Sequence, residues 1–252
     1  MQNAVAIIPA RYNSTRFPGK PLADLKGKTM IQRVYENVSK AGLVDSVLVA
    51  TDDKRIFDAV AAFGGKVVMT SGRHASGTDR IAEAAAGIDC DLVVNVQGDE
   101  PFIRPGMIDD VIDLLYNDEK ASISTLAKKI TDVNDIMSPN VVKVVMDNEG
   151  YALYFSRSPI PYCRDGWKDL NSITSRIDDM LMFKHIGIYG FRKKALLEFS
   201  SMSPCRLENI EKLEQLRALA AGMRIKVRET AFDTFGIDTV EDLRKAENAL
   251  GN

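Results

Sequence analysis

The chain has 252 residues, of which 45% are hydrophobic and 27% are charged, and its formal net charge is −2. This length and balance are typical of a soluble α/β protein that buries a full hydrophobic core. A net charge near zero excludes an overall positive field for nucleic acid or acidic membranes, so an anionic substrate needs a local cluster of Arg and Lys. The three cysteines are widely spaced, which argues against a disulfide framework and favours a reducing compartment.

The apolar runs of the sequence are all short. None approaches the ~20 apolar residues of a membrane span, and the run near the N-terminus is too short for the core of a signal peptide. We therefore expect a cytoplasmic protein that binds neither membranes nor nucleic acid.

Short apolar runs alternate with segments of helical spacing through the first half of the chain. Strands are predicted at 4–9, 46–50, 66–70 and 91–96, and helices at 29–41, 55–63, 78–86 and 107–116. This alternation predicts an α/β fold with a mostly parallel central sheet. Ligands of such sheets bind beyond the carboxyl ends of the strands, so the loops after residues 9, 70 and 96 are expected to carry the chemistry.

The pattern changes after residue 120. Strands are predicted at 122–127, 141–147, 151–155 and 184–191, with a hairpin turn at Asp147-Asn148-Glu149-Gly150. We interpret 120–200 as an antiparallel insertion, a lid or dimerisation lobe, within a single domain that covers 1–252. An amphipathic helix is predicted at 204–221, a short strand at 225–227 and a closing helix at 239–250.

The loop from Pro9 to Pro21 combines Arg11, Arg16 and Lys20 with hydroxyl groups and a glycine. Backbone N–H groups near the glycine and the three cations can bind a polyphosphate. The loop has neither the Walker spacing nor GxGxxG, which excludes a dehydrogenase-type site. An ordinary basic surface loop is the alternative, but the position at the ligand-binding edge of the sheet favours phosphate binding.

A second polar cluster, Gln97-Gly98-Asp99-Glu100, follows the strand at 91–96. Opposite the basic loop, a carboxylate can hold Mg²⁺ against substrate phosphates, because magnesium takes only one or two protein carboxylates in such sites. The alternative is that the two acids cap the helix that begins near residue 105. Asp238 also precedes a helix, and on its own this position is more typical of a cap than of a metal ligand.

Two further segments contribute candidates for binding. His74 is a possible general base, although a hydrogen-bonded surface histidine is the favoured interpretation. The neighbouring hydroxyls of Ser76 and Thr78, with Gly77 between them, can contact a base or a sugar. The polar start of the strand at 184–191, together with acids of the helix at 204–221, can line a polyol pocket, although most of those acids are expected to form a solvated face.

Taken in order, the segments IIPARYNSTRFPGKPL, VVNVQGDEPFI, YALYFSR, HIGIYGF, LEQLRAL and GIDTVEDL resemble the 3-deoxy-manno-octulosonate cytidylyltransferases. The resemblance runs from residue 4 to about residue 245. It implies a Rossmann-like nucleotidyltransferase fold, a homodimer, dependence on Mg²⁺ and a place in lipopolysaccharide biosynthesis. The implied reaction transfers CMP from CTP to the anomeric hydroxyl of the eight-carbon acidic sugar and releases pyrophosphate.

The resemblance also implies roles for individual residues. Arg11 and Lys20 match triphosphate-binding positions, and Asp99 and Asp238 match magnesium-binding positions. The resemblance therefore implies that Asp238 is a metal ligand rather than a helix cap. The remaining matches bind substrate: Pro9, Ala10, Arg16, Ser76, Gly77 and Thr78 on the nucleotide side, and Gln97, Arg157, Arg164, His185, Tyr189 and Glu211 on the sugar side.

Two alternatives stay open. One is a cytidylyltransferase for a related acidic sugar, such as the 8-amino octulosonate or a sialic acid. The other is a nucleotide-binding sensor without catalysis. A sensor has no need of metal carboxylates or of a lysine in the phosphate loop, so Asp99, Asp238 and Lys20 favour the enzyme.

Overall fold

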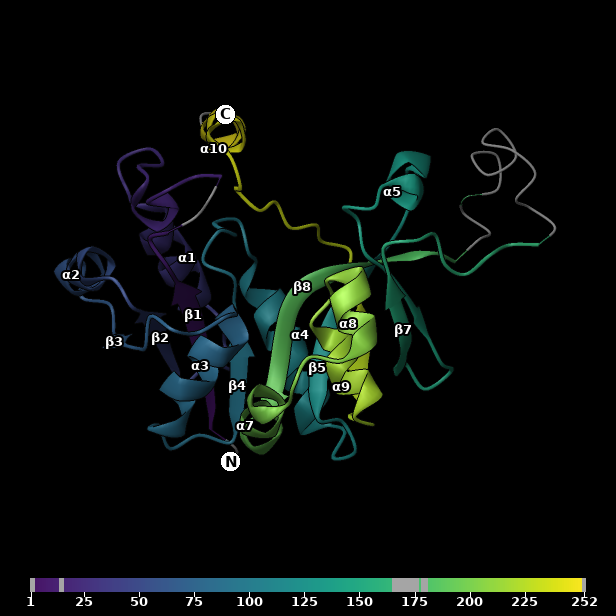
Figure 1. Cartoon of the computed structure of the whole chain (residues 1–252). Helices are drawn as coiled ribbons and strands as arrows, with labels where there is room; N and C mark the ends of the chain where they lie inside the picture. Colours follow the sequence, from purple (N-terminus) through teal and green to yellow (C-terminus); the bar gives the residue numbers. More distant parts are fainter. Residues whose placement is uncertain (1–2, 14–15, 165–176, 178–180, 251–252) are drawn as a thin grey trace. The chain divides into compact units, whose positions relative to one another are not determined.

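The structure is a computed structural model that describes residues 3–13, 16–164, 177 and 181–250 (Figure 1). The chain divides into two compact units. The first unit comprises Met1–Asp113, Ile188–Ser200 and Thr234–Asn252, and the second comprises Leu114–Gly187 and Ser201–Asp233. The single domain with an inserted lobe at about 120–200 stays a prediction. No helix in the described ranges combines the length and the apolar character needed to span a membrane.

The first unit is built mainly from alternating strands and helices. Its elements are β1 (Ala4–Ala10), the 3₁₀-helix η1 (Lys20–Leu22), α1 (Met30–Val38), β2 (Ser46–Thr51), α2 (Lys54–Ala62), β3 (Val67–Met69), α3 (Gly77–Ala86), β4 (Leu92–Asn95), most of α4 (Pro105–Tyr116), the second half of β8 (Phe183–Arg192), α7 (Lys193–Ser201) and α10 (Val240–Leu250). The predicted alternation is therefore confirmed. Helix α7 was not predicted; it follows β8 with no loop between them.

The strands of the first unit run in the order β3-β2-β1-β4-β8. The contacts of β1 with β2 and β4, and of β2 with β3, are parallel, whereas β4 and β8 are antiparallel. Chain order therefore reverses between β1 and β4. In sheets of this kind, ligands bind at the crevice beyond the carboxyl ends of the two strands where the order reverses. The topology thus places the candidate site after Ala10 and Asn95.

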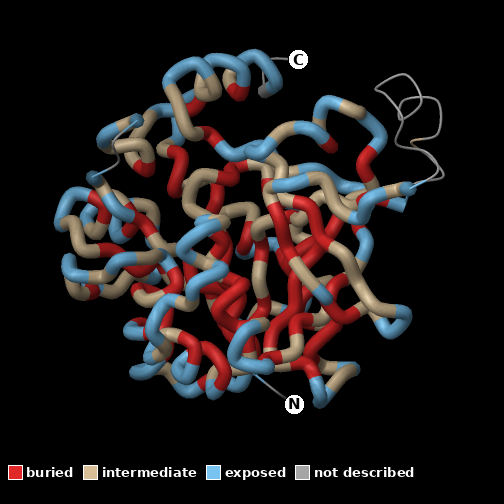
Figure 2. The backbone as a smooth tube through the Cα atoms, turned by 45° about the vertical axis from the view of Figure 1, so that its right-hand side comes forward, coloured by how far each residue is buried: buried red, intermediate tan, exposed pale blue. Residues whose placement is uncertain are grey.

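Local patterning explains why these segments form the sheet and its covering helices. Strand β1 is buried at every position except Pro9, and β4 is buried throughout, as the red segments of Figure 2 illustrate. Continuous burial matches the unbroken apolar runs from which the strands were predicted. Helix α1 is capped by Thr29, whose side chain accepts a hydrogen bond from the Gln32 N–H, and it buries the apolar face that its spacing predicted.

The second unit contains β5 (Ile123–Lys129), α5 (Val133–Met137), β6 (Lys143–Met146), β7 (Ala152–Ser156), the first half of β8, α8 (Arg206–Glu211), α9 (Gln215–Ala220) and β9 (Ile225–Glu229). Strands β6 and β7 form the predicted antiparallel hairpin, and the Gly150 N–H donates to the Asp147 carbonyl in its turn at 3.0 Å. Strand β5, which was expected in the same antiparallel group, lies between β8 and β9 in the sheet, and its pairing with β9 is parallel. The long connection between these two strands allows the crossover that parallel pairing needs.

The amphipathic helix predicted at 204–221 is interrupted in the structure. Its chain forms two helices, α8 and α9, and Lys212 between them has φ 54° and ψ 45° in the left-handed region. The Arg157 side chain donates to the Glu211 carbonyl at 2.7 Å and to the Lys212 carbonyl at 3.5 Å. A tertiary contact therefore satisfies carbonyl groups at the end of α8, and helical spacing alone cannot predict such a contact.

A tyrosine–aspartate pair holds the β6–β7 hairpin to its neighbours in the second unit. The Tyr151 hydroxyl donates to Asp118 Oδ2 at 2.5 Å, and Lys226 Nζ lies 3.0 Å from the same oxygen. The hydrogen bond from Tyr151 lowers the pKa of Asp118 to about 2, and burial together with Asp118 raises the pKa of Tyr151 to about 12. The folded protein therefore stabilises the ionised carboxylate.

We expect Asp118→Asn to lower the free energy of unfolding by about 1–2 kcal/mol at pH 7. Because the pKa of Asp118 is depressed, its contribution is complete above about pH 4 and is lost as the pH falls toward 2. Urea denaturation at pH 7 and pH 3 measures both effects, with the exposed neighbour Glu119→Gln as control. An equal loss for Asp118→Asn at both pH values would contradict the assignment.

Candidate active site

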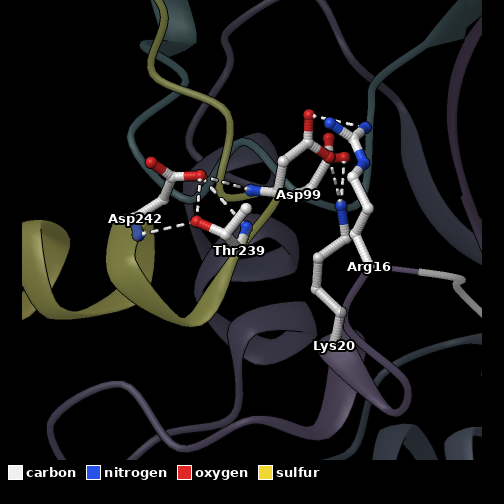
Figure 3. A network of polar contacts seen from close by, with 6 residues as sticks. Arg16, Lys20, Asp99, Thr239 and Asp242 are labelled. Atoms are coloured by element: carbon white, nitrogen blue, oxygen red, sulfur yellow. Dashed lines mark hydrogen bonds and ion pairs between the residues drawn. The ribbon is translucent and has the colours of Figure 1, made fainter.

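Lys20 lies between two carboxylates in the first unit (Figure 3). Its Nζ atom is 2.6 Å from Asp99 Oδ2 and 3.1 Å from Asp238 Oδ1. Arg16 approaches the other oxygen of Asp238 at 3.0 Å. The Lys20 side chain is only 14% exposed, so these charge-assisted bonds are partly shielded from water. Residues separated by up to 222 positions in the sequence thus form one polar network.

The loop after β1 is shaped by a close backbone turn at Gly19. This residue has φ 74°, and its N–H donates to the Tyr12 carbonyl at 2.9 Å. A Cβ atom at Gly19 would lie 3.1 Å from the Tyr12 ring. Both the positive φ and the lack of space require glycine. The turn starts η1 with Lys20 as its first residue, which directs this lysine to its two carboxylates.

The tip of β4 approaches the end of β1 closely. A Cβ atom at Gly98 would lie 3.0 Å from the carbonyl oxygen of Pro9, so a larger residue would force the two segments to shift apart. The backbone of Asp99 accepts a hydrogen bond from the Ile237 N–H at 2.9 Å, which brings the segment before α10 to the same place. Helix α4 begins only at Pro105, and the Asp99 side chain bonds to Lys20, so the alternative of a helix cap is wrong for Asp99.

Asp238 precedes α10, but the side chains that cap this helix belong to the residues that follow it. The hydroxyl of Thr239 accepts from the Asp242 N–H at 3.1 Å, and Asp242 Oδ2 accepts from the Thr239 N–H at 3.0 Å. This reciprocal pair is a capping box. The carboxylate of Asp238 therefore accepts hydrogen bonds from Lys20 and Arg16.

A cavity of about 320 Å³ opens onto this network. Its walls come from the loop after β1, from the start of α3, from the tip of β4 and from the segment before α10. Four cationic side chains face two carboxylates, a formal excess of two positive charges that suits an anionic ligand. The predicted residues that line it are Pro9, Ala10, Arg11, Arg16, Lys20, Ser76, Gly77, Gln97, Asp99 and Asp238.

The start of α3 forms another wall of the cavity. Ser76 and Asp79 make a capping box at its N-terminus, and Gly77 lies against Pro9, where a Cβ atom would come within 3.3 Å of the proline ring. Thr78 is buried and does not line the cavity. His74 lines the cavity and contacts Glu83, which agrees with the predicted hydrogen-bonded histidine.

Arg80 also lines the cavity, although it was not predicted as a site residue. It is 4% exposed, donates to the Thr70 hydroxyl at 2.5 Å and lies 3.2 Å from Asp52 Oδ2. These two partners fix its guanidinium in the cavity wall. Its position four residues after Ser76, one helical turn into α3, was the available sequence signal.

Glu100 follows Asp99 but has a different environment. It is 9% exposed, and burial, with a further contribution from the Asp99 charge, raises its pKa to about 7. A hydrogen bond with Thr234 opposes that shift. The two neighbouring acids therefore differ: Asp99 faces the cavity cations, whereas Glu100 is enclosed and does not line the cavity.

In the second unit, Arg157 and Glu211 are joined by two hydrogen bonds. The Arg157 N–H donates to Glu211 Oε2 at 2.9 Å, and its Nε donates to the Glu211 carbonyl at 2.7 Å. The Ser156 hydroxyl donates to Glu211 Oε1 at 2.6 Å. The acceptors of the Arg157 guanidinium in the described residues are main-chain carbonyls, so its positive charge is not neutralised by those contacts.

The other candidates for the sugar side lie apart in the sequence. His185 in β8 is 2.9 Å from the Thr125 hydroxyl, and burial lowers its pKa to about 3, so it is neutral at physiological pH. Tyr189 belongs to the half of β8 that pairs with β4, opposite Asn95. Gln97 donates to the Asn95 side chain at 3.2 Å. Arg164 is exposed.

The paired carboxylates fit a hard divalent cation. Asp99 and Asp238 both direct an oxygen to the single Nζ of Lys20, so they converge tightly enough to share one cation. Within the described ranges, no group of three or more His, Cys, Asp or Glu side chains forms a metal cluster. One or two protein carboxylates are typical of such a cation when substrate phosphates complete its coordination, and this pair fits that number.

Comparison with known proteins gives the family. The model of the cytidylyltransferase family matches residues 5–225. A 3-deoxy-manno-octulosonate cytidylyltransferase of Geobacter metallireducens is 56% identical over 97% of this chain and 96% of its own, and one of Geotalea daltonii is 57% identical over 97% of each. The chain belongs to the 3-deoxy-manno-octulosonate cytidylyltransferase family. The resemblance found in the sequence is thereby confirmed.

Solved structures agree with this membership of the octulosonate cytidylyltransferase family. A CMP:2-keto-3-deoxy-manno-octonic acid synthetase complexed with CTP matches with a TM-score of 0.90 and 42% identity, over 99% of this chain and 98% of the other. A 4-diphosphocytidyl-2C-methyl-D-erythritol synthase of Anaerococcus prevotii matches with a TM-score of 0.63 at 16% identity. At that identity the second match shows the fold alone.

Proposed function

We propose that this chain transfers CMP from CTP to the anomeric hydroxyl of 3-deoxy-manno-octulosonate, giving the CMP-sugar and pyrophosphate. The observation that carries this proposal is the network of Lys20, Asp99 and Asp238 at the edge of a cationic cavity. The reaction needs cations for a triphosphate and carboxylates for a metal, and this network supplies both. Relatives named 3-deoxy-manno-octulosonate cytidylyltransferase, which are more than half identical over nearly the whole chain, support the proposal.

We assign the nucleotide to the cavity of the first unit. Arg11, Arg16 and Lys20 neutralise phosphate charge and orient the α-phosphate for attack, because phosphoryl-type transfer depends mainly on positioning and charge compensation. The capped N-terminus of α3, with Ser76 and Gly77, offers N–H groups and a hydroxyl to the nucleoside. No covalent enzyme intermediate is required.

We assign the metal to Asp99 and Asp238, with Mg²⁺ as the ion. When bound, such an ion polarises phosphate oxygens and lowers the pKa of a coordinated hydroxyl. In the free protein, Lys20 balances the charge of both carboxylates. The same lysine can turn to the triphosphate once the carboxylates hold another cation.

We assign the acidic sugar to Gln97, Arg157, Arg164, His185, Tyr189 and Glu211. The positive charge of Arg157 is available to the sugar carboxylate, since its guanidinium contacts are made to neutral carbonyls. The neutral imidazole of His185 can donate or accept a hydrogen bond with a sugar hydroxyl.

Pyrophosphate release from CTP tests the activity. Purified protein with Mg²⁺ and CTP is offered the octulosonate, its 8-amino analogue and N-acetylneuraminate in separate reactions. We expect release with the octulosonate, abolished by EDTA and restored by added Mg²⁺. Release only with another of these sugars would change the assigned substrate. A protein that binds CTP but releases no pyrophosphate with any of them would be a nucleotide sensor.

We also propose a homodimer that works in the cytoplasm in lipopolysaccharide biosynthesis. The resemblance of the sequence to the octulosonate cytidylyltransferases supports both the assembly and the pathway. Light scattering should give twice the 27.8 kDa of one chain. A mass of one chain at micromolar concentration would contradict the dimer.

A further inference from the structure

Lys143, the first residue of β6, is a fully buried lysine in the second unit. It has 0% exposure and is among the largest fully buried side chains in the described ranges. Burying an ammonium group is unfavourable unless its protons are all bound. Its three donors go to three carbonyl oxygens, those of Ser138 at 2.8 Å, Val141 at 2.5 Å and Arg157 at 2.7 Å.

These three acceptors carry no charge. Within the described residues, the hydrogen bonds of Lys143 are all to main-chain carbonyls and none is to a carboxylate. An apolar side chain of similar size fits a strand interior at lower electrostatic cost. The lysine therefore provides something that a methionine cannot, namely a positive charge and a fixed link between the turn at 138–141 and the chain after β7.

Arg157 binds the same turn from the other side. Its Nη1 donates to the Pro139 carbonyl at 2.8 Å, while its own carbonyl accepts from Lys143. Its N–H is held by Glu211, which also accepts from Ser156, the strand partner of Lys143. Lys143, the turn, Arg157 and Glu211 form a closed ring of contacts, and the charges of Glu211 and Asp135 both act on Lys143.

We propose that Lys143 is a positioning residue for the acidic sugar: it holds the backbone of Arg157 and the turn at 138–141, and thereby orients Arg157 and Glu211. This inference rests on the proposed function, which assigns the sugar to Arg157 and Glu211. Lys143 touches no substrate in this scheme.

Lys143→Met tests the proposal by separating the two substrates. The variant keeps an unbranched side chain that is one atom shorter, and it removes the charge and all three donors. We expect the KM for the octulosonate to rise at least ~10-fold, because Arg157 and Glu211 lose their fixed positions, while the KM for CTP stays within about twofold. A sugar KM equal to that of the wild type, or equal increases for both substrates, would overturn the proposal.

Tyr151→Phe is the matched control, since it removes the hydrogen bond to Asp118 near the turn of the same hairpin. It should lower stability without changing either KM. Lys143→Arg keeps the charge but cannot direct three bonds from one nitrogen, so its sugar KM should lie between those of the wild type and Lys143→Met. If the methionine variant does not fold, an unchanged sugar KM in Lys143→Arg overturns the proposal.

Hydrogen exchange separates this proposal from the proposed function. In Lys143→Met the amides of Ser138, Asn140, Val141 and Arg157 should exchange faster than in the wild type, whether or not the sugar is turned over. A wild-type protein that releases no pyrophosphate with the octulosonate would contradict the function. Unchanged exchange at these amides would contradict the positioning role.

Discussion

We expect the Asp99→Asn variant to fold normally and to lose turnover by roughly 10²–10³-fold. Asparagine has nearly the same shape as aspartate but carries no charge. It therefore weakens the hold on a divalent cation and the 2.6 Å contact with Lys20. The effect should fall on kcat as well as on the metal requirement, since the carboxylate contributes to charge compensation where the phosphate reacts. Initial rates over a series of Mg²⁺ concentrations measure both.

The control for this variant is Asp53→Asn. Asp53 caps α2 and pairs with Arg55, and it does not line the cavity. It should keep wild-type kinetics with a small loss of stability. Asp238→Asn should follow Asp99→Asn, with a smaller effect because its side chain is 45% exposed, against 29% for Asp99. An Asp99→Asn protein that is active at ordinary Mg²⁺ concentrations would exclude Asp99 as a metal ligand.

The sequence predicts the first unit well because its signals are local. Apolar runs and helical spacing give β1, α1, α2, α3 and β4, and the rule that ligands bind beyond strand ends then gives the site. Lys20 and Asp99 are 79 residues apart in the sequence, but each follows a strand at the point where chain order reverses. The topology therefore brings them together without any knowledge of the side-chain contacts.

Asp238 shows where local reasoning was incomplete. Its position before a helix predicts a helix cap, and only the resemblance to a family indicated that Asp238 is a metal ligand. In the structure, Thr239 and Asp242 form the capping box. A threonine followed three residues later by an acid is a recognisable signal of that box. The pattern therefore already indicated that the Asp238 carboxylate was free for another partner.

The second unit is predicted less well because its structure depends on tertiary contacts. Spacing alone predicts one helix at 204–221, but the chain turns at Lys212, where Arg157 binds the carbonyls at the end of α8. Similarly, the alternation of Lys143 with apolar neighbours does not reveal that its ammonium group is buried. Buried polar groups are stable only when all their bonds are made, and the partners lie in other segments.

Lys20→Met should weaken CTP binding by about 10- to 100-fold, which corresponds to the ~1.5–3 kcal/mol of a hydrogen bond to a charged group. The lysine is one of four cations lining the cavity, and it also balances Asp99 and Asp238. Without it, the two carboxylates face the triphosphate directly, so repulsion adds to the lost attraction. The loss should therefore be larger when Mg²⁺ is removed, and calorimetry with and without EDTA measures the difference.

Lys28→Met separates this effect from a general loss of positive charge. Lys28 pairs with Glu36 at the surface, with a side chain 44% exposed, and it does not line the cavity. Its variant has the same net charge as Lys20→Met, so any long-range electrostatic effect on CTP is common to both. If Lys20 contacts the triphosphate directly, CTP binding should be weaker in Lys20→Met but not in Lys28→Met. Equal CTP affinities in the two variants would mean that Lys20 balances the carboxylates without contributing to triphosphate binding.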